Sequence, residues 1–445
     1  MLRHCLRTWI IVAIVLAFGS YNGVETYSQA KSKRVEANIV HRFDFGTGRL
    51  QPGFTTVLAT TVYSREKGYG FEPGAAVECL ATGGSDPLHE DFCTSKSPFY
   101  FSVALPEGNY NVTITFGNQK AATATTVKAE LRRLMLEEVK TKPGQFSTLT
   151  FTVNIRTAQI IGGGEVKLKE REKTMEAWAW DEKLTLEFNN LRPTVNAIQI
   201  ARADTVPTIF LLGDSTVTDQ PREPYNSWGQ MFTRFLKFGI AVANHAQSGE
   251  SLRSSLNARR LDKVLSVMKP GDYLFIQFGH NDQKEKGEGV GPFTTYKTSL
   301  KHYVDETRKR GGFPVLLTSM HRRTFDAQGS ITDSHGEYDD AVRQLAVEEK
   351  VPLIDLHKMS KPFYEALGPE ISKRAFAPND NTHHNNYGSY QLARCVVESI
   401  RVQDFGLAKH LAFDVLPFDP HRPDNIEAFK VPESPLISDV KPLGS

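Results

Sequence analysis

Ser215 is the leading candidate for a reactive residue in this chain. It follows an apolar run, in the stretch 209–217 with the sequence I-F-L-L-G-D-S-T-V. A buried parallel strand that breaks into a turn presents the next side chains at the edge of its sheet. A serine hydroxyl becomes a useful nucleophile only when a base removes its proton, and that base needs an orienting carboxylate. The pattern therefore indicates nucleophilic catalysis, provided that a histidine and an acid exist elsewhere.

Both partners occur near the end of the chain. The stretch 377–390, A-P-N-D-N-T-H-H-N-N-Y-G-S-Y, places Asp380 three residues before His383, a spacing at which one turn brings carboxylate and imidazole together. His384 is the alternative base, but the D-x-x-H register favours His383. Asp214 lies next to the nucleophile, where we expect it to brace the turn by hydrogen bonds.

A serine hydrolase also needs donors aimed at the oxyanion of its tetrahedral intermediate. Two segments suit that role. Gly249, in A-N-H-A-Q-S-G-E-S-L-R, lets the backbone approach a ligand closely, and Asn281, in G-H-N-D, sits just beyond the apolar run D-Y-L-F-I-Q-F. Both positions fall where α/β sheets place their active sites.

These residues need a scaffold, and the chain is long enough for two domains. It has 445 residues, of which 40% are hydrophobic. The 53 Lys and Arg residues nearly balance the 51 Asp and Glu residues, and no basic stripe occurs. A nucleic-acid partner is therefore not expected. His245, His280 and His321 share no ligand spacing, so no metal site is expected either.

The first residues, M-L-R-H-C-L-R and then T-W-I-I-V-A-I-V-L-A-F, form a positive segment followed by a short apolar core. This pattern predicts a secretory signal peptide over residues 1–30, the alternative being an uncleaved anchor. We therefore expect a secreted or periplasmic protein with no membrane association after cleavage. Cys79 and Cys93 flank a Gly/Asp/Pro-rich loop, and whether they form a disulfide stays open. Cys395 lies in an apolar helix pattern.

Two patterns divide the rest of the chain. Over 37–203, alternating segments such as N-Y-N-V-T-I-T-F and S-T-L-T-F-T-V-N-I predict an all-β sandwich. Over 205–411, apolar strand-like runs alternate with helical segments at 228–239, 294–310 and 336–349, which predicts an α/β domain with a parallel sheet. The short junction near Asp204 to Pro207 suggests that the domains pack together. Residues 412–445 are Pro-rich and are expected to form an irregular tail packed on the surface.

The blocks G-D-S-T, N-H-A-Q-S-G-E-S, G-H-N-D and D-x-x-H, in that order, resemble the four sequence blocks of the SGNH (GDSL) hydrolases. The forms N-S-W-G-Q, Q-F-G-H-N-D-Q-K, R-R-T-F-D and D-N-T-H-H-N-N-Y-G look like the rhamnogalacturonan acetylesterase branch. The segments F-D-F-G-T-G, P-G-F-T-T-V and K-G-Y-G-F resemble the opening of a galactose-binding-like jelly roll.

The resemblance implies a fold and a set of roles. The fold would be an SGNH-type three-layer α/β/α domain preceded by the jelly roll. Ser215 would be the nucleophile, His383 the base and Asp380 its orienter, with Ser215 N–H, Gly249 N–H and the Asn281 side chain as the oxyanion hole. No cofactor is implied. Further candidates to contact the substrate are Trp228, Glu250, Arg253 and His280.

The resemblance implies that the substrate is an acetyl ester on pectin, with rhamnogalacturonan first. Other esters remain alternatives on the same scaffold, namely acetyl xylan, pectin methyl ester or lysophospholipid, because a fold does not fix a function. A carbohydrate-binding protein with an inactive hydrolase domain is the alternative from another class. The oligomeric state and sugar binding by the first domain stay open.

Overall fold

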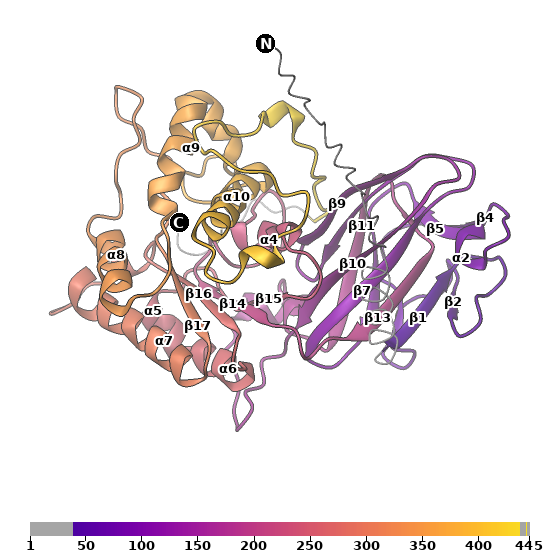
Figure 1. The fold of residues 1–445 in the computed structure, drawn as a ribbon, viewed down its shortest axis with the longest axis horizontal. Coiled ribbons are helices and arrows are strands. Elements are labelled where there is room, and N and C mark those ends of the chain that lie inside the picture. The colour runs from indigo at the N-terminus through magenta and orange to yellow at the C-terminus, as the bar shows by residue number, and fades with distance from the viewer. Residues whose placement is uncertain (1–38, 437–441, 443–445) are drawn as a thin grey trace, which may run out of the picture.

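The computed structural model describes residues 39–436 and residue 442 (Figure 1). The predicted signal peptide lies outside the described residues. Two parts are visible, a β-sandwich drawn in indigo to magenta and an α/β part drawn in pink to yellow. They confirm the predicted fold class.

The β-sandwich packs two five-stranded sheets face to face, with a third small sheet at one end. In spatial order, the first sheet contains β10 (Phe146–Ile155), β7 (Gly108–Gly117), β13 (Ala197–Arg202), β1 (Ile39–Phe45) and β2 (Thr55–Val57). The second contains β3 (Tyr69–Phe71), β6 (Phe99–Ala104), β11 (Lys183–Arg192), β8 (Thr123–Ala129) and β9 (Arg133–Thr141). The third contains β12 (Thr194–Val195), β5 (Asp91–Ser95) and β4 (Val77–Ala81). Alternate residues such as Val112, Ile114 and Phe116 point inward and are fully buried, as the alternating sequence predicts.

The second part is built on a parallel sheet. Its spatial order is β15 (Ala241–Asn244), β14 (Thr208–Gly213), β16 (Tyr273–Gln277), β17 (Phe313–Leu317) and β18 (Leu353–Ile354). The strands are continuous apolar runs because helices cover both faces. One face carries α4 (Trp228–Phe232), α9 (Leu356–Ile371) and α10 (Asn386–Gln403). The other carries α5 (Leu252–Asn257), α6 (Arg260–Val267), α7 (Lys297–Lys309) and α8 (Tyr338–Glu349).

Local signals explain where these helices begin and end. Ser227 caps α4 by accepting a hydrogen bond from the backbone N–H of Gln230. The helix expected over 228–239 is shorter, because α4 passes into a 3-10 turn at Thr233–Phe235. No helix was expected at α9, which contains Pro362 and Pro369 and is kinked at Gly368. Two small helices lie in the first part, α2 (Pro87–Glu90) and α3 (Glu170–Lys173).

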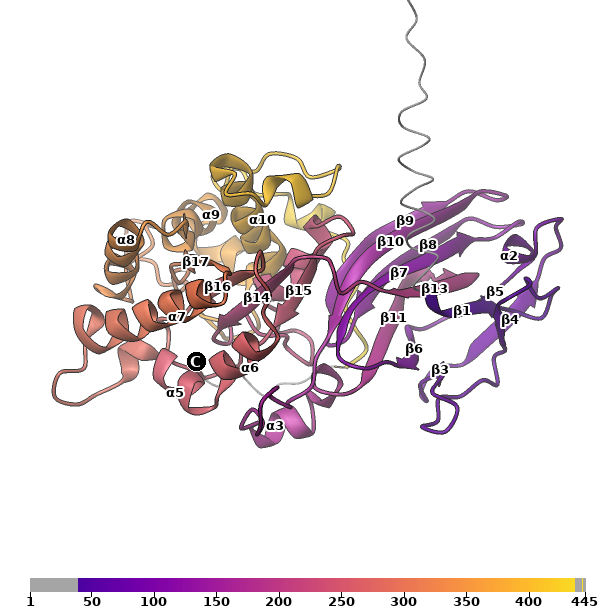
Figure 2. The ribbon, with the colours of Figure 1, turned by 60° about the horizontal axis from the view of Figure 1, so that its bottom comes forward.

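The two parts share an interface along one side of the sandwich (Figure 2). The turn between β8 and β9 enters the α/β part, where Leu134 joins the core of the catalytic sheet. The guanidinium of Arg133 donates to the carbonyls of Val242 in β15 and Asn154 in β10, at 2.9 and 3.1 Å. The tail crosses back over the interface, and Lys128 Nζ donates to Ser434 Oγ at 2.7 Å. The active-site sheet is therefore held from its side by the sandwich.

Two further features concern the surroundings of the protein. Cys79 and Cys93 form a disulfide across the paired strands β4 and β5, whereas Cys395 is a buried free thiol. Within 39–436, none of the helices is long and apolar enough to cross a bilayer.

Candidate active site

The fold brings Ser215, His383 and Asp380 into one hydrogen-bonded chain. Ser215 lies in the turn after β14, and the other two lie in the loop that leads into α10. Ser215 Oγ and His383 Nε2 are 2.8 Å apart, and His383 Nδ1 and Asp380 Oδ2 are 2.9 Å apart. In the neutral imidazole, Nδ1–H donates to the carboxylate, which leaves Nε2 to accept from the serine hydroxyl. A histidine in that tautomer can take the proton from Ser215.

The loop holds the Asp380 carboxylate in its ionised form. Burial alone would raise the pKa of Asp380, but His383 and the backbone N–H groups of Thr382 and His383 lower it well below its ordinary value. Asp380 Oδ1 accepts those two N–H groups at 2.8 and 3.0 Å. The carboxylate is thus fixed with one oxygen free to orient the imidazole.

The turn that carries Ser215 is braced from within. Asp214 Oδ1 accepts from the backbone N–H and the hydroxyl of Thr216, at 2.9 and 2.8 Å. Gln220 Nε2 donates to the carbonyl of Ser215 at 2.7 Å. The sequence predicted the bracing role of Asp214 but not that of Gln220, whose only signal is its place in the same loop, five residues after the serine.

Asp214 also forms a buried pair with His280, whose Nδ1 lies 3.2 Å from Asp214 Oδ2. Burial lowers the pKa of His280 to about 4, with the Asp214 carboxylate opposing the shift. Burial would raise the pKa of Asp214, but His280 and Thr216 lower it below its ordinary value. An ionised Asp214 therefore accepts from a neutral His280.

The oxyanion candidates lie at the ends of neighbouring strands. Asn281 follows β16 and donates through Nδ2 to the carbonyl of Glu250 at 3.0 Å, which uses one of its two amide hydrogens. Gly249 has a φ of +77°, in the region that favours glycine. Among the described residues, neither the N–H of Ser215 nor that of Gly249 has a hydrogen-bond partner. These N–H groups can stabilise the negative charge that develops on an oxyanion.

Three of the four candidate substrate contacts, Trp228, Glu250 and His280, are buried. Trp228 is 1% exposed and donates through Nε1 to Gln277 Oε1 at 2.8 Å. Glu250 is 1% exposed and pairs with Lys169 at 2.8 Å. His280 is fully buried against Asp214. The polar groups of Trp228 and Glu250 are paired inside the protein and support the framework of the site, whereas His280 Nε2 has no hydrogen-bond partner among the described residues.

Arg253 remains a candidate contact. Its side chain is exposed and pairs with Glu285 at 3.1 Å. It lines a cavity of about 420 Å³ together with Asp282, Thr294 and Tyr338. Asp282 directly follows Asn281 in the chain, but Ser215, Gly249 and Asn281 do not line this cavity.

His384 lies apart from the nucleophile. Its Nε2 is 2.8 Å from the hydroxyl of Tyr364, and its ring packs 4.1 Å from that of Phe376. Burial, with His383 beside it, lowers the pKa of His384 to about 3. The geometry therefore favours His383 as the base.

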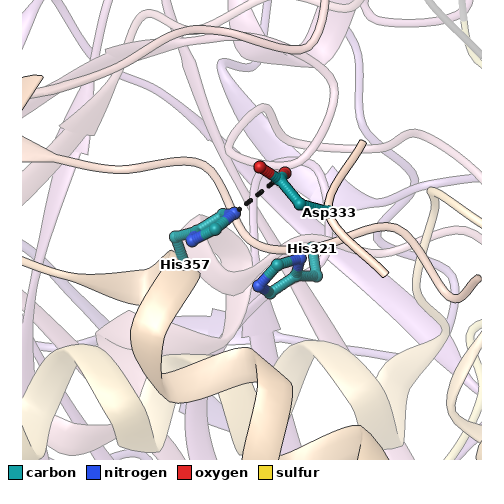
Figure 3. A group of neighbouring side chains, drawn as sticks. All are labelled: His321, Asp333 and His357. Carbon is teal, nitrogen blue, oxygen red and sulfur yellow. Dashed lines mark hydrogen bonds and ion pairs between the residues drawn. The ribbon is translucent and has the colours of Figure 1, made fainter. Parts of the chain in front are cut away.

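A second histidine group lies at the ends of β17 and β18 and was not expected from the sequence. Figure 3 shows His321, Asp333 and His357 converging from three separate segments. His357 Nε2 lies 3.3 Å from Asp333 Oδ1 and 3.5 Å from Asp339 Oδ2. Arg343 Nη2 donates to His357 Nδ1 at 3.2 Å. Because a guanidinium only donates, the neutral imidazole carries its proton on Nε2, toward the carboxylates, where a metal ion would need a free lone pair.

The arrangement is suited to acyl transfer through a serine, and the comparisons with known proteins agree. Residues 211–389 match the GDSL-like lipase/acylhydrolase family, and residues 41–160 match the galactose-binding domain-like family of β-agarase/YXIM esterase-like proteins. The chain belongs to the GDSL-like lipase/acylhydrolase family and is a carboxylic ester hydrolase.

Two relatives are similar to this chain over nearly all of their own length. Rhamnogalacturonan acetylesterase RhgT of Bacillus subtilis is 42% identical over 218 residues, which are 46% of this chain and 93% of that protein. The uncharacterised esterase YxiM of the same organism is 29% identical over 89% of this chain and 99% of its own length. The crystal structure of YxiM aligns with 82% of this chain and 99% of its own, at 26% identity and a TM-score of 0.44.

Proposed function

We propose that this protein removes acetyl groups from acetylated pectin, with rhamnogalacturonan as its substrate. The chemistry rests on the hydrogen-bonded chain from Ser215 through His383 to Asp380. The substrate rests on the 42% identity to the rhamnogalacturonan acetylesterase RhgT, which extends over 93% of that relative.

In the proposed mechanism, His383 takes the proton of Ser215 as Oγ attacks the acetyl carbonyl. The oxyanion forms opposite the N–H groups of Ser215 and Gly249 and the amide of Asn281. Collapse of the intermediate breaks the bond to the sugar oxygen, and His383 returns the proton to that oxygen. Water then attacks the acetyl-serine with the same base, which releases acetate and restores Ser215.

The narrow access to Ser215 supports a small acyl group. Ser215 and His383 are each 1% exposed. A long acyl chain would need an apolar groove at this point, whereas an acetyl group needs only a small opening. The shape therefore favours acetyl esters over lysophospholipids.

We also propose that the protein acts outside the cytoplasm, as the sequence of residues 1–30 indicates. A large polysaccharide is found there, and the disulfide between Cys79 and Cys93 suits an oxidising compartment.

A substrate panel tests the proposal. Purified protein would be mixed separately with acetylated rhamnogalacturonan, acetylated xylan, methyl-esterified pectin and lysophosphatidylcholine, and acetate, methanol and fatty acid would be measured. We expect acetate from rhamnogalacturonan at the highest kcat/KM. A higher kcat/KM on acetylated xylan would overturn the substrate while leaving the acetyl ester chemistry in place.

A further inference from the structure

A pocket of about 250 Å³ lies where the sandwich meets the α/β part. Its walls come from β6, from the turn between β8 and β9, from the segment 174–178 and from the loop after Ser215. The residues that matter to its chemistry are Tyr100, Glu130, Trp178 and Arg222. Pockets between domains are common ligand sites, and this one is small enough for a single sugar residue.

One wall is aromatic. Trp178 is half-buried, and the ring of Tyr100 meets it edge to face at 5.2 Å between centroids. Lys183 Nζ lies 5.5 Å from the centre of the Trp178 ring, which adds positive charge nearby. A tryptophan fixed in this way offers a flat apolar surface with a polar edge, which suits the faces of a sugar ring.

The lining also contains a cation, Arg222. Arg222 is partly exposed and, among the described residues, has no hydrogen-bond or ion-pair partner. The neighbouring Arg132 is different, because it is buried and pairs with Glu223 at 2.5 Å. A free guanidinium in a pocket is suited to bind a carboxylate through two parallel hydrogen bonds.

The acidic residue in the lining does not oppose an anion. Glu130 is buried, burial raises its pKa to about 8, and Arg133 Nη2 lies 3.9 Å from its Oε2, so its carboxyl presents no unpaired negative charge. Glu130 Oε1 also accepts from the backbone N–H of Thr185 at 3.1 Å. The free charge facing the pocket is therefore the positive charge of Arg222.

The pocket is joined to the active site through one loop. Gln220 donates to the carbonyl of Ser215, and its own carbonyl accepts from Arg132 Nη1 at 3.1 Å. Arg132 Nη1 also donates to the carbonyl of Tyr225, at 2.8 Å. Arg222 lies between these two anchored residues, so the loop that carries it is fixed at both ends to the same side chain.

We propose that this pocket binds a uronic acid residue of the polysaccharide, with Trp178 against the sugar ring and Arg222 on the carboxylate. The pocket would be an accessory subsite that holds the chain while a neighbouring acetylated residue reaches Ser215. The inference rests on the proposed function in its choice of polysaccharide. It assigns the first domain a direct part in substrate binding, because Trp178 and Tyr100 belong to that domain.

The test is a binding experiment that needs no catalysis. The Ser215→Ala protein would be titrated by calorimetry with trigalacturonic acid and with the same trisaccharide after reduction of its carboxyl groups. We expect the acidic probe to bind more tightly, and Arg222→Gln to weaken its binding by about tenfold or more, the loss typical of a charged hydrogen bond. Arg222→Lys should recover part of the affinity, because it keeps the charge but not the two parallel bonds.

Two further variants complete the design. Trp178→Ala should weaken both probes, whereas Arg310→Gln, a change at an exposed arginine on the α/β part, should alter neither. Equal binding of the acidic and reduced probes, or an unchanged Kd in Arg222→Gln, would overturn the inference. Acetate release from acetylated rhamnogalacturonan by the unmodified protein is measured in parallel. Release without pocket binding would sink the inference alone, and binding without release would sink the proposed function alone.

Discussion

At the scale of residues, the site depends on groups that lie 168 positions apart in the chain, Ser215 and His383. Each is a common residue type, and the hydrogen bond between them is what would make the serine a nucleophile in the proposed mechanism. The local environment sets the rest, since the same loop that ionises Asp380 also fixes the tautomer of His383. The residues next to them, Asp214 and His384, are held by other partners.

Substitution of Asn281 tests the oxyanion assignment. Asn281→Ala should lower kcat on an aryl acetate by about 10²–10³, with little change in KM, because the amide acts on the charge that develops in the transition state. Steady-state kinetics measure both values. An equal rise in KM with an unchanged kcat would show that Asn281 binds the ground state instead.

The two adjacent histidines give a matched pair. His383→Ala should reduce kcat by at least about 10³, because no other base lies within hydrogen-bonding distance of Ser215 among the described residues. His384→Gln should keep far more activity, since His384 bonds to Tyr364 and does not contact the serine. The opposite ranking of the two variants would contradict the assignment of the base.

The sequence was sufficient to predict the site residues that lie in a motif. It was insufficient to predict those that only the fold brings to the site. Ser215, Asp380 and His383 lie in recognisable blocks, and the structure joins them. Trp228 and Glu250 also lie in motif-like stretches, but their polar groups pair with Gln277 and Lys169, and proximity in sequence does not show such contacts. The bracing by Gln220 depends on a contact across a loop, which no pattern of residue types records.

At the scale of elements, the turn between β8 and β9 ties the sandwich to the active-site loop. Arg132 binds two carbonyls of the loop and pairs with Glu223 in a buried setting. The sequence predicted a β-sandwich over 37–203, but it did not show that this turn would contact the other domain. α9 was missed for a different reason, since its two prolines are signals against a helix.

Arg132→Met should therefore destabilise the protein strongly. Removing one partner of a buried ion pair leaves the Glu223 carboxylate short of a charge partner, which typically costs about 3–5 kcal/mol. Urea unfolding measures the change, and Arg65→Met, at an exposed position of the same domain, is the control. A loss of less than about 1 kcal/mol would mean that Lys128, 3.9 Å from Glu223, is a sufficient partner by itself.

At the scale of the whole molecule, buried titratable groups make the free energy of unfolding depend on pH. Burial raises the pKa of Asp282 and Glu130 to about 8 and that of Asp181 to about 7. In the unfolded chain these carboxyl groups lose their protons near pH 4, whereas in the folded protein they keep them up to about pH 7 to 8. The free energy of unfolding therefore falls as the pH rises from about 4 to 8. His280 and His384 act at the other end, because burial lowers their pKa to about 4 and 3 and stability falls as pH drops below about 6.5.

The melting temperature should accordingly decline between about pH 6.5 and pH 8, where only the carboxyl groups contribute, and level off above pH 8, where the folded protein also loses these protons. Differential scanning calorimetry between pH 5 and pH 9 measures the profile. Asp282→Asn, which keeps an oxygen for the N–H of Leu252 but cannot ionise, should reduce the decline above pH 6. A variant profile parallel to that of the unmodified protein would show that Asp282 is already ionised in the folded state.

The most direct test of the proposed activity is the release of acetate from acetylated rhamnogalacturonan by the purified protein, with Ser215→Ala as its control. We expect acetate release by the unmodified protein and a loss of at least about 10³ in rate for the variant. Equal release by both proteins would contradict the role of Ser215. No release from this polymer, with continued hydrolysis of a small aryl acetate, would contradict the substrate.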